Sequence, residues 1–349
     1  MRLGVTLPQN WKFDPRTDLV RGARKAEELG YDSVWVAERV LYPQDQTGIH
    51  RLTEYGDGAW PDVYRKVLDP IVAMTMAATV TSRVRIGASV LLPPLHLPYR
   101  LANSLAAIGA ISGGRVVAGL GTGWSVDEFA ATAPRPMAER GAALEEFLDV
   151  ADAVWGPDPA SFENERYTLW PAETGPKPAE RIPVFLGGWS PKPLERIARR
   201  ADGWLPVMVP PAQVASTLTD LRKRAEEHGR DPQAIRCIAI IALGGEFVRV
   251  ETADRPPYQG SIEQILGDVA ELGAAGVEEA LTLPNISRDI EEYSDLLAEF
   301  HAAFGAAGIW PPGFRRHPGR PTGRDVRARR LLCSCRSVVE RSLTARLRY

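Results

Sequence analysis

The stretch that decides the fold runs from Ser112 to Glu128 and is SGGRVVAGLGTGWSVDE. Gly113 and Gly114 can end a helix, because glycine tolerates the left-handed conformation found at helix C-termini. The apolar run Val116–Leu120 that follows is typical of a buried strand, and it leads into a glycine-rich corner. A helix, a strand and a corner in this order indicate one repeating unit of an α/β fold.

The glycine-rich corner consists of Gly119, Gly121 and Gly123. Backbone without a Cβ can approach a planar or charged ligand closely, although a purely structural tight turn has the same pattern. A dinucleotide-binding fingerprint needs a helix that opens inside the glycines and an acidic residue about twenty positions later. Here Trp124 and Asp127 follow the glycines at once, which argues against that fingerprint. The corner is therefore either a ligand-binding turn or a structural one.

Outward from this stretch, short β-branched runs alternate with longer helical patterns about eight times. The predicted strands are Leu3–Leu7, Ser33–Ala37, Val84–Leu92, Val116–Leu120, Pro183–Leu186, Gly203–Met208, Ile235–Leu243 and Glu279–Leu283. The predicted helices cover residues 17–29, 69–80, 98–111, 138–155, 190–201, 211–228, 261–274 and 289–304. Several strands are apolar throughout, as expected for parallel strands that are covered on both faces. The alternation predicts a closed (β/α)8 TIM barrel, with an open doubly wound sheet as the alternative.

Two long segments interrupt this rhythm, one after the second predicted strand and one after the fourth. Residues 38–68 contain Tyr42, Trp60 and further aromatic residues. Residues 156–182 are rich in proline, glycine and aromatic residues, and residues 162–167 are expected to form a small hairpin. Loops of this length inside a compact domain are usually functional. We expect both insertions to line an aromatic, mostly apolar pocket.

The composition excludes several classes of protein. The chain has 349 residues and a formal net charge of -2, so it has no overall attraction for nucleic acid or an anionic membrane. It contains no apolar run long enough to span a membrane, and its first residues are typical of a strand and not of a signal peptide. Three cysteines make no disulfide framework, which favours a reducing, cytoplasmic location. No hydrolase triad and no metal-ligand spacing is present, so we expect no metal.

The C-terminal region differs in composition from the rest of the chain. Residues 314–349 contain eleven arginines, no lysine and two acidic residues. We therefore predict a barrel over residues 1–310 and an unrelated, disordered, Arg-rich extension over residues 311–349. Three origins stay open for this extension: a disordered segment of unknown role, the out-of-frame translation of a gene end, or an arm that binds nucleic acid or a membrane.

Five stretches together resemble the luciferase-like monooxygenase family, and more narrowly its branch that uses the deazaflavin coenzyme F420. The resemblance covers about residues 1–310, and the order and spacing of the stretches make it specific. The stretches are ELGYDSVWVAE (residues 28–38), RIGASV (residues 85–90), residues 112–128, VFLGGW (residues 184–189) and RADGW (residues 200–204). The resemblance implies a barrel enzyme that holds a flavin or deazaflavin ring at the ends of its strands.

The resemblance also implies roles for residues near the second and third strands. Glu38 would stand at the mouth of the barrel, close to the ring. Many relatives have a histidine directly after this acid, but here the residue is Arg39. A guanidinium stays protonated, so Arg39 can stabilise an anionic ring or bind an acidic substrate but cannot act as an ordinary acid or base. Ser89-Val90 aligns with a bulge that carries a non-prolyl cis peptide in relatives, and we expect a cis or distorted bond there.

Further cofactor and substrate contacts are expected at the other glycine-rich corners. Gly187, Gly188, Trp189 and Ser190 lie where a strand meets a helix, and free N–H groups at a helix start can bind a phosphate. The remaining predicted site residues are Thr122, Gly123, Trp124, Asp127 and Glu128 for the cofactor, and His50, Trp60 and His96 for the substrate. His96 follows the third strand and is a candidate to replace the histidine that is missing after Glu38.

The favoured function is hydride transfer between coenzyme F420 and a small organic substrate, with Glu38, Arg39 and Trp124 as candidate catalytic residues. One alternative is an FMN-dependent monooxygenase that acts with O2. Another is a non-catalytic barrel that only binds a flavin-like ligand, which Arg39 at the expected histidine position makes plausible. A homodimer is possible, as in similar proteins. The sequence does not identify the substrate.

Overall fold

The computed structural model describes residues 1–50, 59–243, 247–251, 255–284 and 287–309. The chain divides into two units, Met1–Phe314 and Arg315–Tyr349. The extension predicted over residues 311–349 lies outside the described residues. All elements named below belong to the first unit.

Eight strands close into a parallel barrel in the order β1-β10-β9-β8-β7-β4-β3-β2. They are β1 Arg2–Thr6, β2 Ser33–Val36, β3 Arg85–Ala88, β4 Val116–Leu120, β7 Val184–Leu186, β8 Gly203–Trp204, β9 Arg236–Ala242 and β10 Glu279–Leu283. In β2 and β3, for example, Val34 is the register partner of Ile86, and in β1 and β10 Gly4 is the partner of Leu281. The predicted (β/α)8 TIM barrel is thereby confirmed, and the open sheet is excluded.

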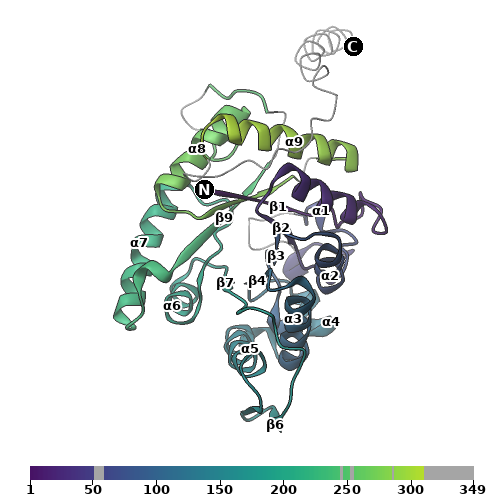
Figure 1. Cartoon of the computed structure of the whole chain (residues 1–349), viewed down its shortest axis with the longest axis vertical. Helices are drawn as coiled ribbons and strands as arrows, with labels where there is room; N and C mark the ends of the chain where they lie inside the picture. Colours follow the sequence, from purple (N-terminus) through teal and green to yellow (C-terminus); the bar gives the residue numbers. More distant parts are fainter. Residues whose placement is uncertain (51–58, 244–246, 252–254, 285–286, 310–349) are drawn as a thin grey trace. The chain divides into compact units, whose positions relative to one another are not determined.

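Helices surround the strands (Figure 1). They are α1 Asp18–Leu29, α2 Pro70–Val80, α3 Pro98–Ser112, α4 Val126–Thr132, α5 Arg140–Trp155, α6 Pro191–Arg200, α7 Pro211–Glu227, α8 Ile262–Ala274 and α9 Ile290–Ala306. Several ends follow the capping chemistry of their residues. Gly30 ends α1 in the left-handed conformation with φ 98°, and Ser261 and Gln264 form a reciprocal capping box at the start of α8. The short helix α4 was not predicted.

Two predicted strands are longer than the observed ones by more than two residues. The prediction Val84–Leu92 becomes β3 (Arg85–Ala88), because the chain leaves the ladder at a cis peptide between Ser89 and Val90. This cis bond confirms the expectation for that position. The prediction Gly203–Met208 becomes the two-residue β8, since Pro206 has no N–H to donate and only an isolated bridge at Val207 follows.

Large side chains fill the interior of the barrel at the level of Trp35, and we call this layer the floor. Trp35, Val117, Phe185, Ile238 and Leu281 come from different strands and form one buried cluster with Leu205 and Ile240. The indole of Trp35 fits because its neighbour Gly87 lacks a Cβ, which would overlap the ring, whereas a Cβ on Gly4 would overlap Ser33 and Glu279. A packed floor of this kind is usual in TIM barrels, so the barrel is not a pore.

A buried polar cluster closes the end where the strands begin. Glu279 is fully buried and accepts hydrogen bonds from the Ser33 hydroxyl at 2.5 Å and from Arg85, with which it forms an ion pair. The Trp35 indole N–H donates to the Ser33 oxygen at 2.6 Å. Burial raises the pKa of Glu279, against the opposing charge of Arg85. Polar contacts at this end of a TIM barrel serve stability, and active sites of TIM barrels lie at the opposite end.

Candidate active site

The mouth of the barrel is lined by small or partly exposed residues. Side chains alternate between the two faces of a strand, so positions two residues beyond the floor also face the interior. The residues at these upper positions are all partly exposed. They are Thr6, Ala37, Val90, Gly187, Val207, Ala242 and Leu283. We call this mostly apolar, partly exposed ring of residues above the filled floor the recess. A flat apolar group matches a recess of this kind.

Three backbone corners at the mouth are contiguous, on neighbouring strands β3, β4 and β7. The N–H of Leu91 donates to the carbonyl of Gly119 at 2.8 Å, and the N–H of Gly187 donates to the carbonyl of Leu120 at 3.0 Å. A Cβ on Gly121 would come within 2.7 Å of the Val90 side chain, so this glycine is required for the close approach. The predicted gathering of glycine-rich corners at successive strand ends is therefore present.

Glu38 lies just beyond the end of β2 and is 4% exposed. Its Oε2 accepts a hydrogen bond from the backbone N–H of Leu92 at 2.6 Å, and its Oε1 lies 2.6 Å from Nε2 of His96. Burial alone would lower the pKa of His96, but the hydrogen bond and the charge of Glu38, together with the charge of Asp69, raise it overall. The structure thus brings His96 to the acid, although both oxygens of Glu38 are already engaged.

The guanidinium of Arg39 is enclosed and paired. Its Nη1 lies 3.1 Å from Oε2 of Glu128, whose side chain is 1% exposed, and its Nε donates to the carbonyl of Glu38 at 2.7 Å. The rings of Tyr64 and Trp124 lie 5.1 and 4.9 Å from its central carbon, within the range of cation–π attraction. Burial raises the pKa of Glu128, against the opposing charge of Arg39. Arg39 therefore joins the insertion after β2 to α4.

A second carboxylate–imidazole pair lies beside Arg39. Nδ1 of His50 is 2.8 Å from Oδ1 of Asp127, which belongs to the first turn of α4. The indole N–H of Trp60 donates to the carbonyl of His50 at 2.9 Å, and the rings of Trp60 and Trp124 are 4.6 Å apart. Among the described residues, Oδ2 of Asp127 is buried and has no hydrogen-bond partner. The predicted residues His50, Trp60, Trp124 and Asp127 thus form one cluster.

The glycine-rich corner after β7, residues 187–190, lies beside the end of β4, because the two strands are neighbours in the barrel. Gly188 has φ 122°, and its carbonyl accepts a hydrogen bond from the Trp204 indole at 2.9 Å. Trp189 is 49% exposed, and Ser190 precedes the first residue of α6. Pro191 and Pro193 carry no N–H, so the first turn of α6 has fewer donors for a phosphate than a helix start without prolines.

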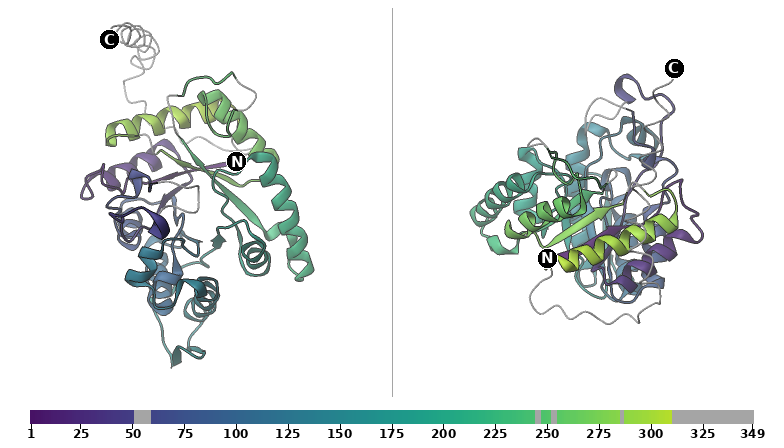
Figure 2. Two further views of the ribbon diagram at one scale, coloured as in Figure 1. Left: turned by 180° about the vertical axis from the view of Figure 1, so that it is seen from behind. Right: turned by 90° about the horizontal axis from the view of Figure 1, so that it is seen from above.

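The expectation that residues 156–182 line the same pocket is wrong. This segment follows α5 and contains the hairpin of β5 (Ala160–Glu163) and β6 (Thr168–Ala172), which projects beyond the helices at the bottom of Figure 1 and of the left view of Figure 2. It returns to the start of β7, and its Trp170 is 81% exposed. Because a helix returns the chain to the strand beginnings, a segment after α5 lies at the opposite end from the mouth. The predicted hairpin itself is confirmed.

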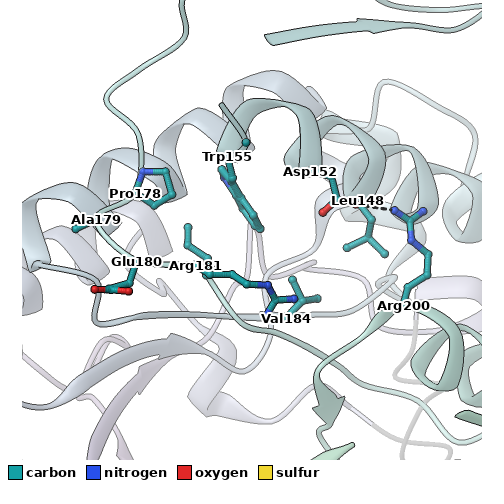
Figure 3. Close-up of a pocket in the computed structure, with 11 residues that line it drawn as sticks. Leu148, Asp152, Trp155, Pro178, Ala179, Glu180, Arg181, Val184 and Arg200 are labelled. Carbon is teal, nitrogen blue, oxygen red and sulfur yellow. Dashed lines mark hydrogen bonds and ion pairs between the residues drawn. The ribbon is translucent and has the colours of Figure 1, made fainter. Parts of the chain in front are cut away.

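A cavity of about 440 Å³ also lies at that opposite end, between the end of α5 and the chain that enters β7. Figure 3 shows Trp155, Glu180 and Arg181 around it, with Arg200 paired to Asp152. Its Arg200 is already held by acidic residues of α5, and its Arg181 pairs with Asp202. The shallow mouth is the better candidate, since it carries the converging polar groups that a binding site needs.

Sequence reasoning missed Gln9, and it had named Tyr64 only as one of the aromatic residues of the insertion after the second strand. Tyr64 faces the guanidinium of Arg39, and the Gln9 side chain bonds both the N–H and the carbonyl of Ala37, at 2.6 and 2.8 Å. The period-two pattern Trp35, Ala37 could have placed Ala37 at the mouth. Within the described residues no group of three His, Cys, Asp or Glu side chains is placed to hold a metal, and no helix there is long and apolar enough to cross a membrane.

Fold and site together define a barrel protein whose candidate site is built from loops at the carboxyl ends of parallel strands. Residues 2–243 match the model of the luciferase-like monooxygenase family, and the chain belongs to that family. This is the family that the resemblance in the sequence implied.

Individual relatives cover only part of the chain. An uncharacterized protein of Mycobacterium tuberculosis is 37% identical over 167 residues, which are 47% of this chain and 58% of the relative. An F420-dependent glucose-6-phosphate dehydrogenase of Amycolatopsis mediterranei is 33% identical over 178 residues, 50% of this chain and 48% of the relative. The chain thus spans about half the length of these curated relatives.

Solved structures match over most of the chain. The monooxygenase RslO1 from Streptomyces bottropensis has a TM-score of 0.68 at 19% identity and covers 88% of this chain and 99% of its own. An F420-dependent secondary alcohol dehydrogenase in complex with an F420-acetone adduct has a TM-score of 0.66 at 18% identity, with coverages of 87% and 99%. At this level of identity the likeness shows the fold alone.

Proposed function

We propose that the chain is an oxidoreductase that transfers a hydride between coenzyme F420 and a small organic substrate. The observation that carries the proposal is the ring of partly exposed residues over a filled floor, bordered by the contiguous corners of β3, β4 and β7. The F420-dependent dehydrogenases among the partial relatives support the choice of cofactor. When bound, a deazaflavin supplies two-electron chemistry as a hydride donor or acceptor, and the protein supplies binding and orientation.

The residues at the mouth fit such a ring. Ser89 Oγ is buried and has no hydrogen-bond partner among the described residues, so it is free to bond a ligand. Ser89 and Val90 would lie behind the ring, and Thr122, Gly123, Gly187 and Gly188 would hold its edges and side chain. A Cβ on Gly187 would meet only two carbonyl oxygens at 3.9 Å, so the absence of a side chain there keeps the recess open.

The wall over the mouth is aromatic. Trp60 and Trp124 stack at a tilt, and Arg39 lies against both rings, at 5.9 and 4.9 Å. In the proposed enzyme this wall excludes water from the substrate. Arg39 keeps its charge paired with Glu128, so proton handling falls to an imidazole and not to Arg39.

An FMN-dependent monooxygenase is the second candidate, which the fold shared with the monooxygenase RslO1 supports. Titration of the purified protein with F420 and, separately, with FMN distinguishes the two through the absorbance and fluorescence of each cofactor. We expect saturable binding of F420. Tight binding of FMN without a response to F420 would reverse the order. Binding of F420 without reduction or oxidation by any substrate pair would favour a non-catalytic binder.

A further inference from the structure

A pocket of about 310 Å³ lies within the insertion after β2, between the segment that leaves the barrel and the segment that returns to it. We call it the insertion pocket. Arg39 and Tyr42 line it from the first segment, and Tyr64, Arg65 and Lys66 line it from the second. It shares no described residue with the ring of the recess. Its volume is at the lower end of the range for small-molecule sites, so it suits a ligand with a single ring.

Two arginine–tyrosine stacks join the two segments that form the insertion pocket. The central carbon of Arg39 lies 5.1 Å from the centre of the Tyr64 ring, and that of Arg65 lies 4.4 Å from the centre of the Tyr42 ring. The Tyr42 hydroxyl donates to the carbonyl of Trp60 at 2.9 Å, which fixes its ring. Stacking holds a planar guanidinium in one orientation, so little side-chain entropy is lost when the group binds a ligand. The donors are thus in place before a ligand arrives.

The charged side chains that line the insertion pocket are all positive. Arg39, Arg65 and Lys66 line it, and among the described residues no aspartate or glutamate does. Arg39 is neutralised by Glu128, and its Nε and Nη1 are engaged, which leaves Nη2 for a ligand. Arg65 pairs with Asp62 at an exposed position, where water weakens the attraction. An anionic group is therefore attracted to the pocket, and a cationic group is repelled.

Lys66 gives an independent indication of a ligand. It forms no ion pair with any described residue, and its backbone is left-handed, with φ 47°. A residue with a Cβ adopts this conformation at a cost in free energy that glycine would avoid. Strained positions of this kind cluster at binding sites, where the side chain has a use that offsets the strain. The ammonium of Lys66 is thus the charge of the pocket that still lacks a partner.

The remainder of the lining is mostly apolar. Val40, Leu41 and Val67 line the insertion pocket together with the rings of Tyr42 and Tyr64. A flat hydrocarbon ring covers such a surface, whereas a sugar would place its hydroxyl groups against it. Guanidinium groups present N–H donors that match the two oxygens of a carboxylate. The lining therefore has the chemistry of a site for an aromatic carboxylic acid.

We infer that the insertion pocket binds an aromatic carboxylate, as a second ligand at a site distinct from the recess. The carboxylate bonds the ammonium of Lys66 and the free edges of the guanidinium groups of Arg39 and Arg65. The aromatic ring lies among the tyrosine rings and the aliphatic side chains. This site goes beyond the proposed function, because it needs neither F420 nor a redox step.

The first experiment is isothermal titration calorimetry of the full chain with benzoate. Benzamide has the same ring without the charge, and we expect it to bind at least about tenfold more weakly, because it loses a charge-assisted hydrogen bond. Acetate has the charge without the ring and should also bind more weakly than benzoate. Added sodium chloride should weaken the binding of benzoate, since the charges are partly exposed. Equal binding of benzoate and benzamide, or no saturable binding of benzoate, would overturn the inference.

The second experiment uses Lys66→Gly, which removes the ammonium and relieves the left-handed backbone. We expect benzoate affinity to fall at least about tenfold. The midpoint of thermal unfolding should change little or rise, because glycine adopts this conformation without strain. Lys223→Gln is the matched control, since Lys223 is an exposed lysine beside Glu227 on α7 and should leave benzoate affinity unchanged. Wild-type affinity in Lys66→Gly would contradict the inference.

The third experiment repeats the benzoate titration with protein that is saturated with F420. We expect benzoate to bind as before, because the insertion pocket and the recess share no described residue. Displacement of benzoate by F420 would place the cofactor in the insertion pocket and would refute a second ligand site. If the protein binds no F420 at all, the proposed function fails, while the titration without F420 still decides the insertion pocket.

Discussion

Nε2 of His96 lies 2.6 Å from Oε1 of Glu38, although 58 positions separate the two residues in the chain. The contact joins the segment after β2 to the loop that enters α3 (Pro98–Ser112). Because Glu38 is buried, its charge acts on the imidazole with little screening by water. The stability of the loops around the mouth therefore depends on pH.

The sign of this dependence follows from the raised pKa of His96, which exceeds the unfolded value of about 6.5. Below the unfolded pKa the full stabilisation is present, and it is lost as pH rises through the higher folded pKa. We expect the difference in unfolding free energy between wild type and His96→Gln to shrink as pH is raised from about 6. Urea denaturation at a series of pH values measures this difference.

A surface pair provides the control for His96. His228 and Glu195 form a similar but exposed contact, and exposed pairs contribute little. His228→Gln should therefore change the free energy of unfolding only slightly at any pH. A difference for His96→Gln that grows with pH would show that the contact with Glu38 does not raise the folded pKa.

Loss of Arg39 should strongly destabilise the protein. Arg39→Met leaves the carboxylate of Glu128 buried without its ion-pair partner, which typically costs about 3–5 kcal/mol. The double variant Arg39→Met with Glu128→Gln should recover much of that loss, because the uncompensated charge is removed. Chemical denaturation gives the free energies, and near-ultraviolet circular dichroism reports the packing of Trp60 and Trp124.

Arg65 is the matched control for Arg39. It lies in the same insertion and pairs with Asp62, but both side chains are exposed. Arg65→Met should cost no more than about 1 kcal/mol. If Arg39→Met and Arg65→Met lowered the free energy of unfolding equally, burial of the Arg39 pair would not be what makes the pair important.

A side chain at Gly187 should block the cofactor without disturbing the fold. Gly187 does not have a positive φ, and a Cβ there would be 3.9 Å from its nearest neighbours. Gly187→Leu would instead extend into the recess. We expect F420 affinity to fall at least about tenfold, which corresponds to about 1.4 kcal/mol. Fluorescence titration measures the affinity, and thermal unfolding checks the fold.

Two other glycines serve as controls for this prediction. Gly267 lies on the exposed face of α8 with no neighbour near its Cβ position, so Gly267→Leu should leave F420 affinity unchanged. Gly188 has φ 122°, and its Cβ would come within 2.6 Å of Pro193, so Gly188→Leu should lower the thermal stability. Full F420 affinity in a folded Gly187→Leu would place the cofactor somewhere other than the recess.

Removal of residues 315–349 should leave the barrel and its cofactor site intact. The described elements lie within Met1–Phe314, where the N-terminal amine of Met1 also bonds the carbonyl of Ile309 at 2.9 Å. We expect the same midpoint of thermal unfolding and the same F420 affinity as in the full chain. A fall in both quantities would show that the Arg-rich extension belongs to the folded unit.

Most of the barrel could be predicted because each of its units carries a local signal. Val116–Leu120 and Glu279–Leu283 are apolar runs of strand length, and both were predicted with the bounds that the structure has. The helix α4 was missed because seven residues are too few for a helical period. The Ser125-x-x-Glu128 pattern of a capping box was its available signal.

The sequence predicted the residues of the site only as separate short stretches, without the contacts between them. Arg39 and Glu128 were both singled out, but nothing in the sequence indicates that they neutralise each other across 89 positions. The position of His96 against Glu38 also depends on how two loops fold back, which no periodicity encodes. Residues 156–182 were misplaced because a loop's composition does not tell at which end of the barrel it lies.

The packing of Trp35 links the natural variation of two positions. Its indole occupies the space that a side chain at Gly87 would otherwise fill, whereas a side chain at Gly4 would overlap Ser33 and Glu279 first. A methyl group gained at Gly87 therefore has to coincide with a smaller residue at position 35, and a smaller residue at position 35 alone would open a void below the recess. Homologous sequences should accordingly change positions 35 and 87 together, so that the filled floor is maintained.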